Sequence, residues 1–180
     1  MKKFINSVRL SIENKNWYSA IFIALSMPDI CGKLARPNLG SQARYIEWFD
    51  SYLLELNSSI FNGDMAIFLT GRDCYALRCS ILHEGTDDIT TQRVRETLEK
   101  IQFTTLGLHR VKIDNILTLN VACFCEEMCE AVENWYNDIK SDEVITGRIE
   151  SMLEIKIKGF NPIPGVFFGE EFKEYTVPVT

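Results

Sequence analysis

The spacing of apolar residues constrains the fold of this chain most. Along most of its 180 residues they recur every three or four positions, which is the period of an amphipathic α-helix. Between residues 101 and 121 they alternate instead, as in a strand with one buried face. The period of the apolar residues thus changes from a helical one to that of a strand and back again. This pattern predicts a mainly α protein, a bundle of about six or seven helices with one small β-hairpin inserted near residues 101–121.

The expected helices differ in how clearly they are marked. The clearest apolar stripe runs from Tyr45 to Leu56, and the stretch 17–27 is apolar almost all round, which predicts a central buried helix. Pro28 is expected to end that helix and to start a separate short turn. Further helices are expected at 4–12, 70–85, 121–139 and 141–153, and the charged segment 86–100 admits a solvated helix.

The alternating region predicts a strand over 101–106 and a hairpin of 108–113 with 116–121. Asp114 and Asn115 between these two strands both tolerate a left-handed backbone, which suits a two-residue turn. His109 is expected to be an exposed strand residue. The tryptophans are expected to be packing residues; they are Trp17, Trp48 and Trp135.

Composition limits the class of protein. With 46% hydrophobic residues the chain can build a substantial core, and its length suits one domain with an appendage. We expect a helical domain over 1–158 and an irregular, aromatic-rich tail over 159–180 that packs on the domain or on a partner subunit. The longest apolar stretch, 11 residues, is too short to cross a bilayer, and no signal peptide is evident. These features predict a cytoplasmic protein that does not bind membranes.

The net charge of −6 argues against broad electrostatic binding of nucleic acid, although it leaves room for a local basic site, particularly one built between subunits. Six cysteines are present, and in the cytoplasm they are expected to be reduced. Cys123, Cys125 and Cys129 invite a metal or redox interpretation, but standard zinc-ligand spacing is absent. A buried cysteine behaves as a small apolar residue, so neither a metal nor a cofactor is expected.

One segment, Thr70–Gly85, reads as a complete short helix and carries the best candidate for chemistry. Thr70 and Asp73 form a capping-box-like start, and Gly85 suits the left-handed residue that follows a helix. Near its end lie Arg78 and His83, five residues apart. On an ideal helix this separation rotates the side chains by about 140°. The pair can therefore converge only if the helix end unwinds, through the long side chains, or across a subunit interface.

This Arg-x4-His run near a helix end, followed by glycine in a largely helical chain, resembles the HEPN superfamily, the higher eukaryotes and prokaryotes nucleotide-binding domains. The wider phrase DCYALRCSILHEG is also similar to a group of bacterial proteins. The resemblance implies a helical bundle that commonly dimerises and brings two motifs together. Active members are metal-independent ribonucleases of toxin and defence systems. By resemblance, Arg78 would stabilise the transition state at phosphate and His83 would act as general acid or base.

Two functions remain open from the sequence. The first is an RNA-cleaving, or an RNA- or nucleotide-binding, domain that acts as a homodimer. The second is a non-catalytic helical dimerisation or scaffold protein, supported by the acidic composition and by Cys79, where many active members have a polar residue after the arginine. The surroundings of Arg78 distinguish them. A common open cleft formed by Arg78 and His83 of two subunits favours the enzyme, and burial of Arg78 against an acidic residue of its own subunit favours the scaffold.

Overall fold

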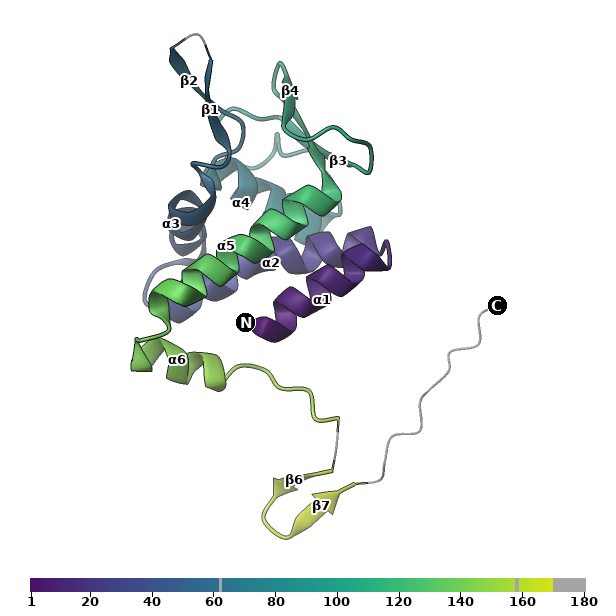
Figure 1. Ribbon diagram of the computed structural model, residues 1–180, viewed down its shortest axis with the longest axis vertical. Helices are drawn as coiled ribbons and strands as arrows, with labels where there is room; N and C mark the ends of the chain where they lie inside the picture. The colour runs from purple at the N-terminus through teal and green to yellow at the C-terminus, as the bar shows by residue number, and fades with distance from the viewer. Residues whose placement is uncertain (62, 158, 170–180) are drawn as a thin grey trace, which may run out of the picture. The chain divides into compact units, whose positions relative to one another are not determined.

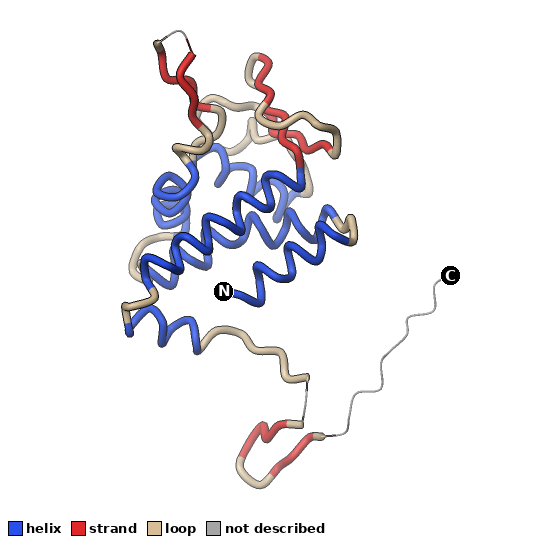
Figure 2. Tube along the Cα trace, in the orientation of Figure 1, coloured by secondary structure: helices blue, strands red, loops and turns tan. Residues whose placement is uncertain are grey.

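The computed structural model describes residues 1–61, 63–157 and 159–169 and confirms a mainly α protein (Figures 1 and 2). Contacts separate the chain into a helical unit, Met1–Ile149, and a second unit from Glu150 onward. Within the described ranges there are six α-helices and one π-helical turn, η1. They are α1 (Lys2–Glu13), α2 (Trp17–Ala35), α3 (Ser41–Leu53), α4 (Gly71–Cys79), η1 (Ser80–Glu84), α5 (Val121–Ile139) and α6 (Glu143–Glu150).

The core of the helical unit forms around α2, which packs against α1, α3 and α5. Figure 1 shows α2 and α5 running beside each other through the body of this unit. Leu25, Phe49 and Trp135 are among its largest fully buried side chains. Because α2 is covered on several sides, its sequence is apolar almost all round, as expected for a central helix.

Helix α2 does not end at Pro28, and the sequence-based expectation of a break there was wrong. Pro28 lies inside the helix and is buried, as are Met27 and Cys31 on either side. A proline inside a helix removes one backbone hydrogen bond and costs about 3 kcal/mol. Packing on both sides of the proline offsets this cost, because breaking the helix would withdraw several apolar side chains from the core.

The prediction of a single hairpin was also inexact, because the described residues form three small sheets. The expected hairpin is present as β4 (Val111–Ile113) and β5 (Ile116–Asn120), with Asp114 at a φ of 52° in its turn. The expected strand β3 (Lys100–Thr104) lies parallel to β5, which gives a three-stranded sheet in the order β3-β5-β4. A second hairpin, β1 (Ser58–Phe61) and β2 (Asp64–Ile67), occupies a segment that reads as a polar break in the sequence.

The segment 86–100 forms no helix, so the suggestion of a solvated helix there was wrong. Ile89 and Leu98 are fully buried and anchor it to the core. Asp73 of α4 accepts a hydrogen bond from the backbone N–H of Glu96 at 2.6 Å. The two buried residues are nine positions apart, which does not follow the period of a helix. The carboxylate of Asp73 accepts the N–H of Glu96, which a helix would have paired with a backbone carbonyl.

The second unit begins at the end of α6, which stops at Glu150 instead of at residue 153. Beyond it lies a short antiparallel hairpin, β6 (Phe160–Ile163) and β7 (Val166–Phe168). Phe167 and Phe168 are exposed within this unit. The end of the expected tail, residues 170–180, lies outside the described residues, and the expectation that the tail packs on a partner stays a prediction.

Candidate functional site

The motif helix begins and ends as its sequence predicts. The hydroxyl oxygen of Thr70 accepts a hydrogen bond from the N–H of Asp73 at 3.1 Å, which satisfies one free donor at the start of α4. Gly85 has a φ of 69° and ends the helical segment. Before Gly85, however, the helix widens, because Ser80–Glu84 form a π-turn. Such turns are rare and frequently occur at functional sites.

The π-turn brings Arg78 and His83 together within one chain. A π-turn closes hydrogen bonds between residues five apart, so side chains with this separation lie nearly one above the other. The Nη1 atom of Arg78 lies 3.1 Å from Nε2 of His83. Of the three possible routes to convergence, the structure therefore shows unwinding of the helix end. His83 itself is exposed.

The contact also defines which atom of His83 accepts. A guanidinium group only donates hydrogen bonds, so in this contact Nε2 of His83 is the acceptor. A neutral imidazole with an available Nε2 can take a proton from a hydroxyl group that replaces Arg78 there. The pair thus places a proton acceptor next to a permanent positive charge.

Arg78 is also held by an acidic residue of its own chain. Its Nη2 atom donates to Asp29 of α2 at 3.2 Å, while Arg44 of α3 approaches the other oxygen of Asp29 at 2.7 Å. The side chains of Asp29, Arg44 and Arg78 are only 17%, 15% and 20% exposed, respectively. The cluster connects α2, α3 and α4 and contains two fixed positive charges and one negative charge.

The remaining contacts of Arg78 restrict its orientation. Its guanidinium carbon lies 6.0 Å from the centre of the Tyr75 ring, within cation–π range. Its Nε atom is buried and has no hydrogen-bond partner in the described part of the chain. Such a donor costs free energy unless a ligand or water satisfies it. Arg78 is therefore held between helices by Asp29 and Tyr75, and its Nη1 atom is the part that contacts exposed His83.

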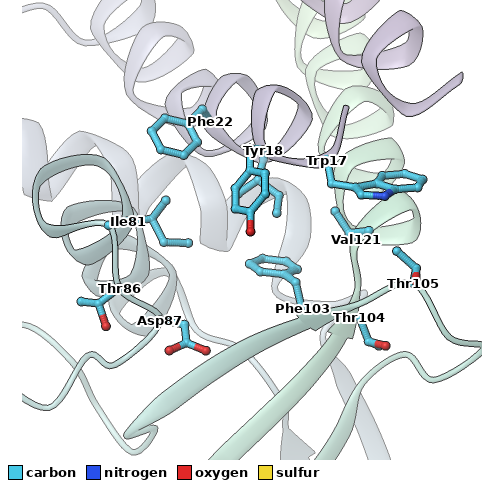
Figure 3. A pocket seen from close by; sticks show the side chains of 12 residues that line it. Trp17, Tyr18, Phe22, Ile81, Thr86, Asp87, Phe103, Thr104, Thr105 and Val121 are labelled. Carbon is cyan, nitrogen blue, oxygen red and sulfur yellow. The ribbon is translucent and has the colours of Figure 1, made fainter. Parts of the chain in front are cut away.

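The π-turn that follows Arg78 in the sequence also borders a groove of about 840 Å³, which several aromatic residues line (Figure 3). The π-turn contributes Ile81 to it, and α2 contributes Tyr18, which is 80% exposed, and half-exposed Phe22. Figure 3 shows Tyr18 and Phe103 facing each other across the groove. Its polar lining residues are Thr86, Asp87, Thr104 and Thr105. A volume of this size suits a small planar ligand or a nucleobase.

His109, the other histidine, is not the exposed strand residue that the sequence suggests. Its side chain is 18% exposed and lies between β5 and α5. Nδ1 accepts the N–H of Asn120 at 3.1 Å, so Nε2 carries the proton and donates to Glu127 at 3.0 Å. Both ring nitrogens are thus occupied by contacts that connect the sheet to a helix, and His109 has a structural role.

Two of the three clustered cysteines act as core residues. Cys125 and Cys129 are buried in α5, while Cys123 is exposed. Burial raises the pKa of both the Cys125 and the Cys129 thiol to about 12, so both are protonated at neutral pH. Within the described ranges, no three His, Cys, Asp or Glu side chains gather as metal ligands, and no helix is long and apolar enough to span a bilayer.

Sequence reasoning identified the motif pair but missed Asp29 and Arg44. An arginine beside core residues predicts an anionic partner, yet it does not say which of 25 acidic residues serves. A signal was available, because Asp29 is the one charged residue in the otherwise apolar stretch from 17 to 32. A carboxylate on a helix that is apolar all round must find a cation.

Comparisons with known proteins add no relative, since no family model, curated protein or solved structure matches this chain.

Proposed function

We propose that this protein is a HEPN-like, metal-independent ribonuclease of a bacterial stress or defence system, and that it works as a homodimer. The observation that carries the proposal is the 3.1 Å contact between Arg78 and His83 at the end of a helix that widens into a π-turn. The widened turn is the feature that aligns these two residues.

The proposed reaction needs no metal. The ribose 2′-hydroxyl replaces Arg78 at Nε2 of His83, gives its proton to the imidazole and attacks the adjacent phosphorus. Negative charge that develops on the phosphoryl oxygens is stabilised by the Nη1 edge of Arg78, which the substrate has released. As the bond from phosphorus to the 5′-oxygen breaks, that oxygen takes a proton from the imidazolium that His83 became in the first step, which returns His83 to its starting form. General acid–base catalysis of this kind contributes about 10²–10⁴-fold.

The surroundings suit a single strand of RNA. The Arg44, Arg78 and Asp29 cluster carries a local excess of positive charge on a protein whose net charge is −6. The aromatic groove offers Tyr18 and Phe103 as surfaces on which an unpaired base can stack. Asp87 in the groove disfavours phosphate and favours the amino edge of a base. The arginine cluster would thus hold the phosphate and the aromatic groove the base, and the π-turn contributes His83 next to the first and Ile81 to the second.

A second function, a non-catalytic helical scaffold, is favoured by one specific contact. Arg78 is largely buried against Asp29 of its own chain, which is the arrangement expected if Arg78 only holds helices together. In that case His83 would simply cover one edge of the guanidinium group. The two functions predict different behaviour of the variants His83→Ala and Arg78→Ala.

The test is incubation of the purified protein with mixed single-stranded RNAs in EDTA. The ribonuclease function predicts that wild type cleaves RNA and that His83→Ala abolishes cleavage with little change in the melting temperature. Exposed residues at a helix end contribute on the order of 1 kcal/mol or less. Arg78→Ala is expected to abolish cleavage and also to destabilise the fold, because Asp29 loses a counter-charge.

A matched control is Arg93→Ala, which removes one exposed positive charge outside the motif and should leave cleavage unchanged. The scaffold function predicts a different pattern. Wild type would be inert on every RNA, Arg78→Ala would lower the melting temperature, and His83→Ala would change nothing measurable. That pattern would exclude the ribonuclease function.

A further inference from the structure

The segment that follows α6 has a strand-type sequence but no strand partner. Leu153, Ile155 and Ile157 alternate with Glu154 and Lys156, which is the two-residue period of a strand with one apolar face. The three apolar side chains are 79%, 76% and 76% exposed, respectively. Among the described residues, 153–157 belong to no ladder. A five-residue segment with one apolar face and no ladder of its own is a template for pairing with another chain.

The order of residues in this segment is complementary to itself. In an antiparallel pair, directly opposite residues have numbers that add to a constant. When two copies of Leu153-Glu-Ile-Lys-Ile157 run antiparallel about Ile155, Leu153 lies opposite Ile157 of the partner subunit. Glu154 then lies opposite Lys156 of the partner subunit, and the second such pair follows by symmetry. All apolar side chains fall on one face and all charges on the other.

We propose that residues 153–157 pair antiparallel with the same segment of a second copy and so form a dimer contact. The charge pattern selects both the partner and the direction. A parallel pair in register would place Glu154 opposite Glu154 of the partner subunit and Lys156 opposite Lys156 of the partner subunit, and like charges directly opposite each other are destabilising. The antiparallel pair turns both contacts into attraction.

The second unit also contains apolar side chains that can cover the apolar face of the two paired segments. Two paired strands alone are marginally stable, so the face formed by six aliphatic side chains needs a cover. The β6–β7 hairpin follows directly in the sequence and exposes Phe167 and Phe168 at 66% and 58%, respectively. Apolar side chains of this size in one short unit favour association over isolated exposure to water. This inference stands independently of RNA cleavage.

The test uses charge reversal and measures mass by analytical ultracentrifugation over a concentration series. In Glu154→Lys, both cross-strand pairs become Lys–Lys, and in Lys156→Glu both become Glu–Glu. Each single variant is expected to dimerise roughly thirtyfold more weakly than wild type, since two pairs change from attraction to repulsion. The double variant Glu154→Lys/Lys156→Glu restores opposite charges and should dimerise like wild type.

Mixing the two single variants tests most directly whether opposite charges across the pair restore the dimer. The Glu154→Lys chain is positive at both sites and the Lys156→Glu chain is negative at both, so the mixture should form a heterodimer at least as tight as the wild-type dimer. Glu13→Lys, an exposed reversal on α1 in the other unit, is the control and should leave the mass unchanged. The proposal is overturned if wild type stays monomeric at tens of micromolar, if the single variants dimerise as well as wild type, or if mixing restores nothing.

Discussion

Asp29 is the only carboxylate seen between Arg44 and Arg78 among the described residues, and its removal should measurably destabilise the helical unit. A hydrogen bond to a charged group contributes about 1.5–3 kcal/mol, and removal of one partner from a buried ion pair costs about 3–5 kcal/mol. The three side chains keep 15–20% exposure, so solvent screens part of this loss. We therefore expect Asp29→Ala to lower the free energy of unfolding by about 2–4 kcal/mol.

For a unit of this size, each kcal/mol shifts the melting temperature by about 2–4 °C, so Asp29→Ala should melt about 4–16 °C below wild type. Urea unfolding measures the free energy directly. The matched control is Glu47→Ala, which breaks an ion pair with Arg36 at 3.1 Å whose side chains are 46% and 65% exposed. Exposed pairs of this kind contribute about 0–1 kcal/mol. If Asp29→Ala loses no more stability than Glu47→Ala, the reasoning about the buried cluster is wrong.

The same position also tests whether the cluster can accept phosphate. In wild type a phosphate group must compete with Asp29 for Arg44 and Arg78, whereas Asp29→Asn leaves both guanidinium groups without a counter-charge. Inorganic phosphate should therefore raise the melting temperature of Asp29→Asn more than that of wild type, because a ligand that binds the folded state stabilises it. An equal response of the two proteins to phosphate would contradict a phosphate-binding role for the arginines.

Three further predictions concern the fold. Gly71→Ala should lower the free energy of unfolding by about 1–3 kcal/mol, because the added Cβ would lie 2.7 Å from a carboxylate oxygen of Asp50, and a urea titration checks this. Ser80→Ala should be neutral or slightly stabilising in thermal melts, since the Ser80 hydroxyl is buried without a partner in the described part of the chain; a large loss would show an unrecognised hydrogen bond. Hydrogen bonds from Arg9 lower the pKa of Glu133, so the folded state favours the carboxylate. The stability advantage of wild type over Glu133→Gln should be complete above the ordinary pKa of glutamate, 4.5, and should shrink as pH falls through the lowered value, as acid melts of both proteins would show.

The helical parts of the fold could be predicted because their signals are local. The stripe from Tyr45 to Leu56 produced α3, although the helix itself ends at Leu53. The Thr70 cap and Gly85 were also predicted correctly, since a capping residue and a left-handed glycine act within a few positions. Local preference failed at Pro28, where contacts from distant helices outweigh the cost of a proline.

The features that the sequence hid depend on contacts between distant residues. The parallel pairing of β3 with β5 joins residues that are 16 positions apart, and no local pattern specifies it. At the site, the sequence identified Arg78 and His83 and left three routes by which they could converge, of which an unwound helix end was one. It could not identify Asp29, which lies 49 residues before Arg78 and meets it only when α2 packs near α4.

We propose that Arg78 and His83 cleave RNA through the ribose 2′-hydroxyl. The most direct measurement follows cleavage, in EDTA, of an oligonucleotide at one mapped bond that carries either ribose or deoxyribose on its 5′ side, with wild type and His83→Ala compared. The account predicts that wild type cuts only the ribose form and that His83→Ala is at least about 100-fold slower. Cleavage of the deoxyribose form, equal rates for the two proteins, or an inert wild type would contradict it.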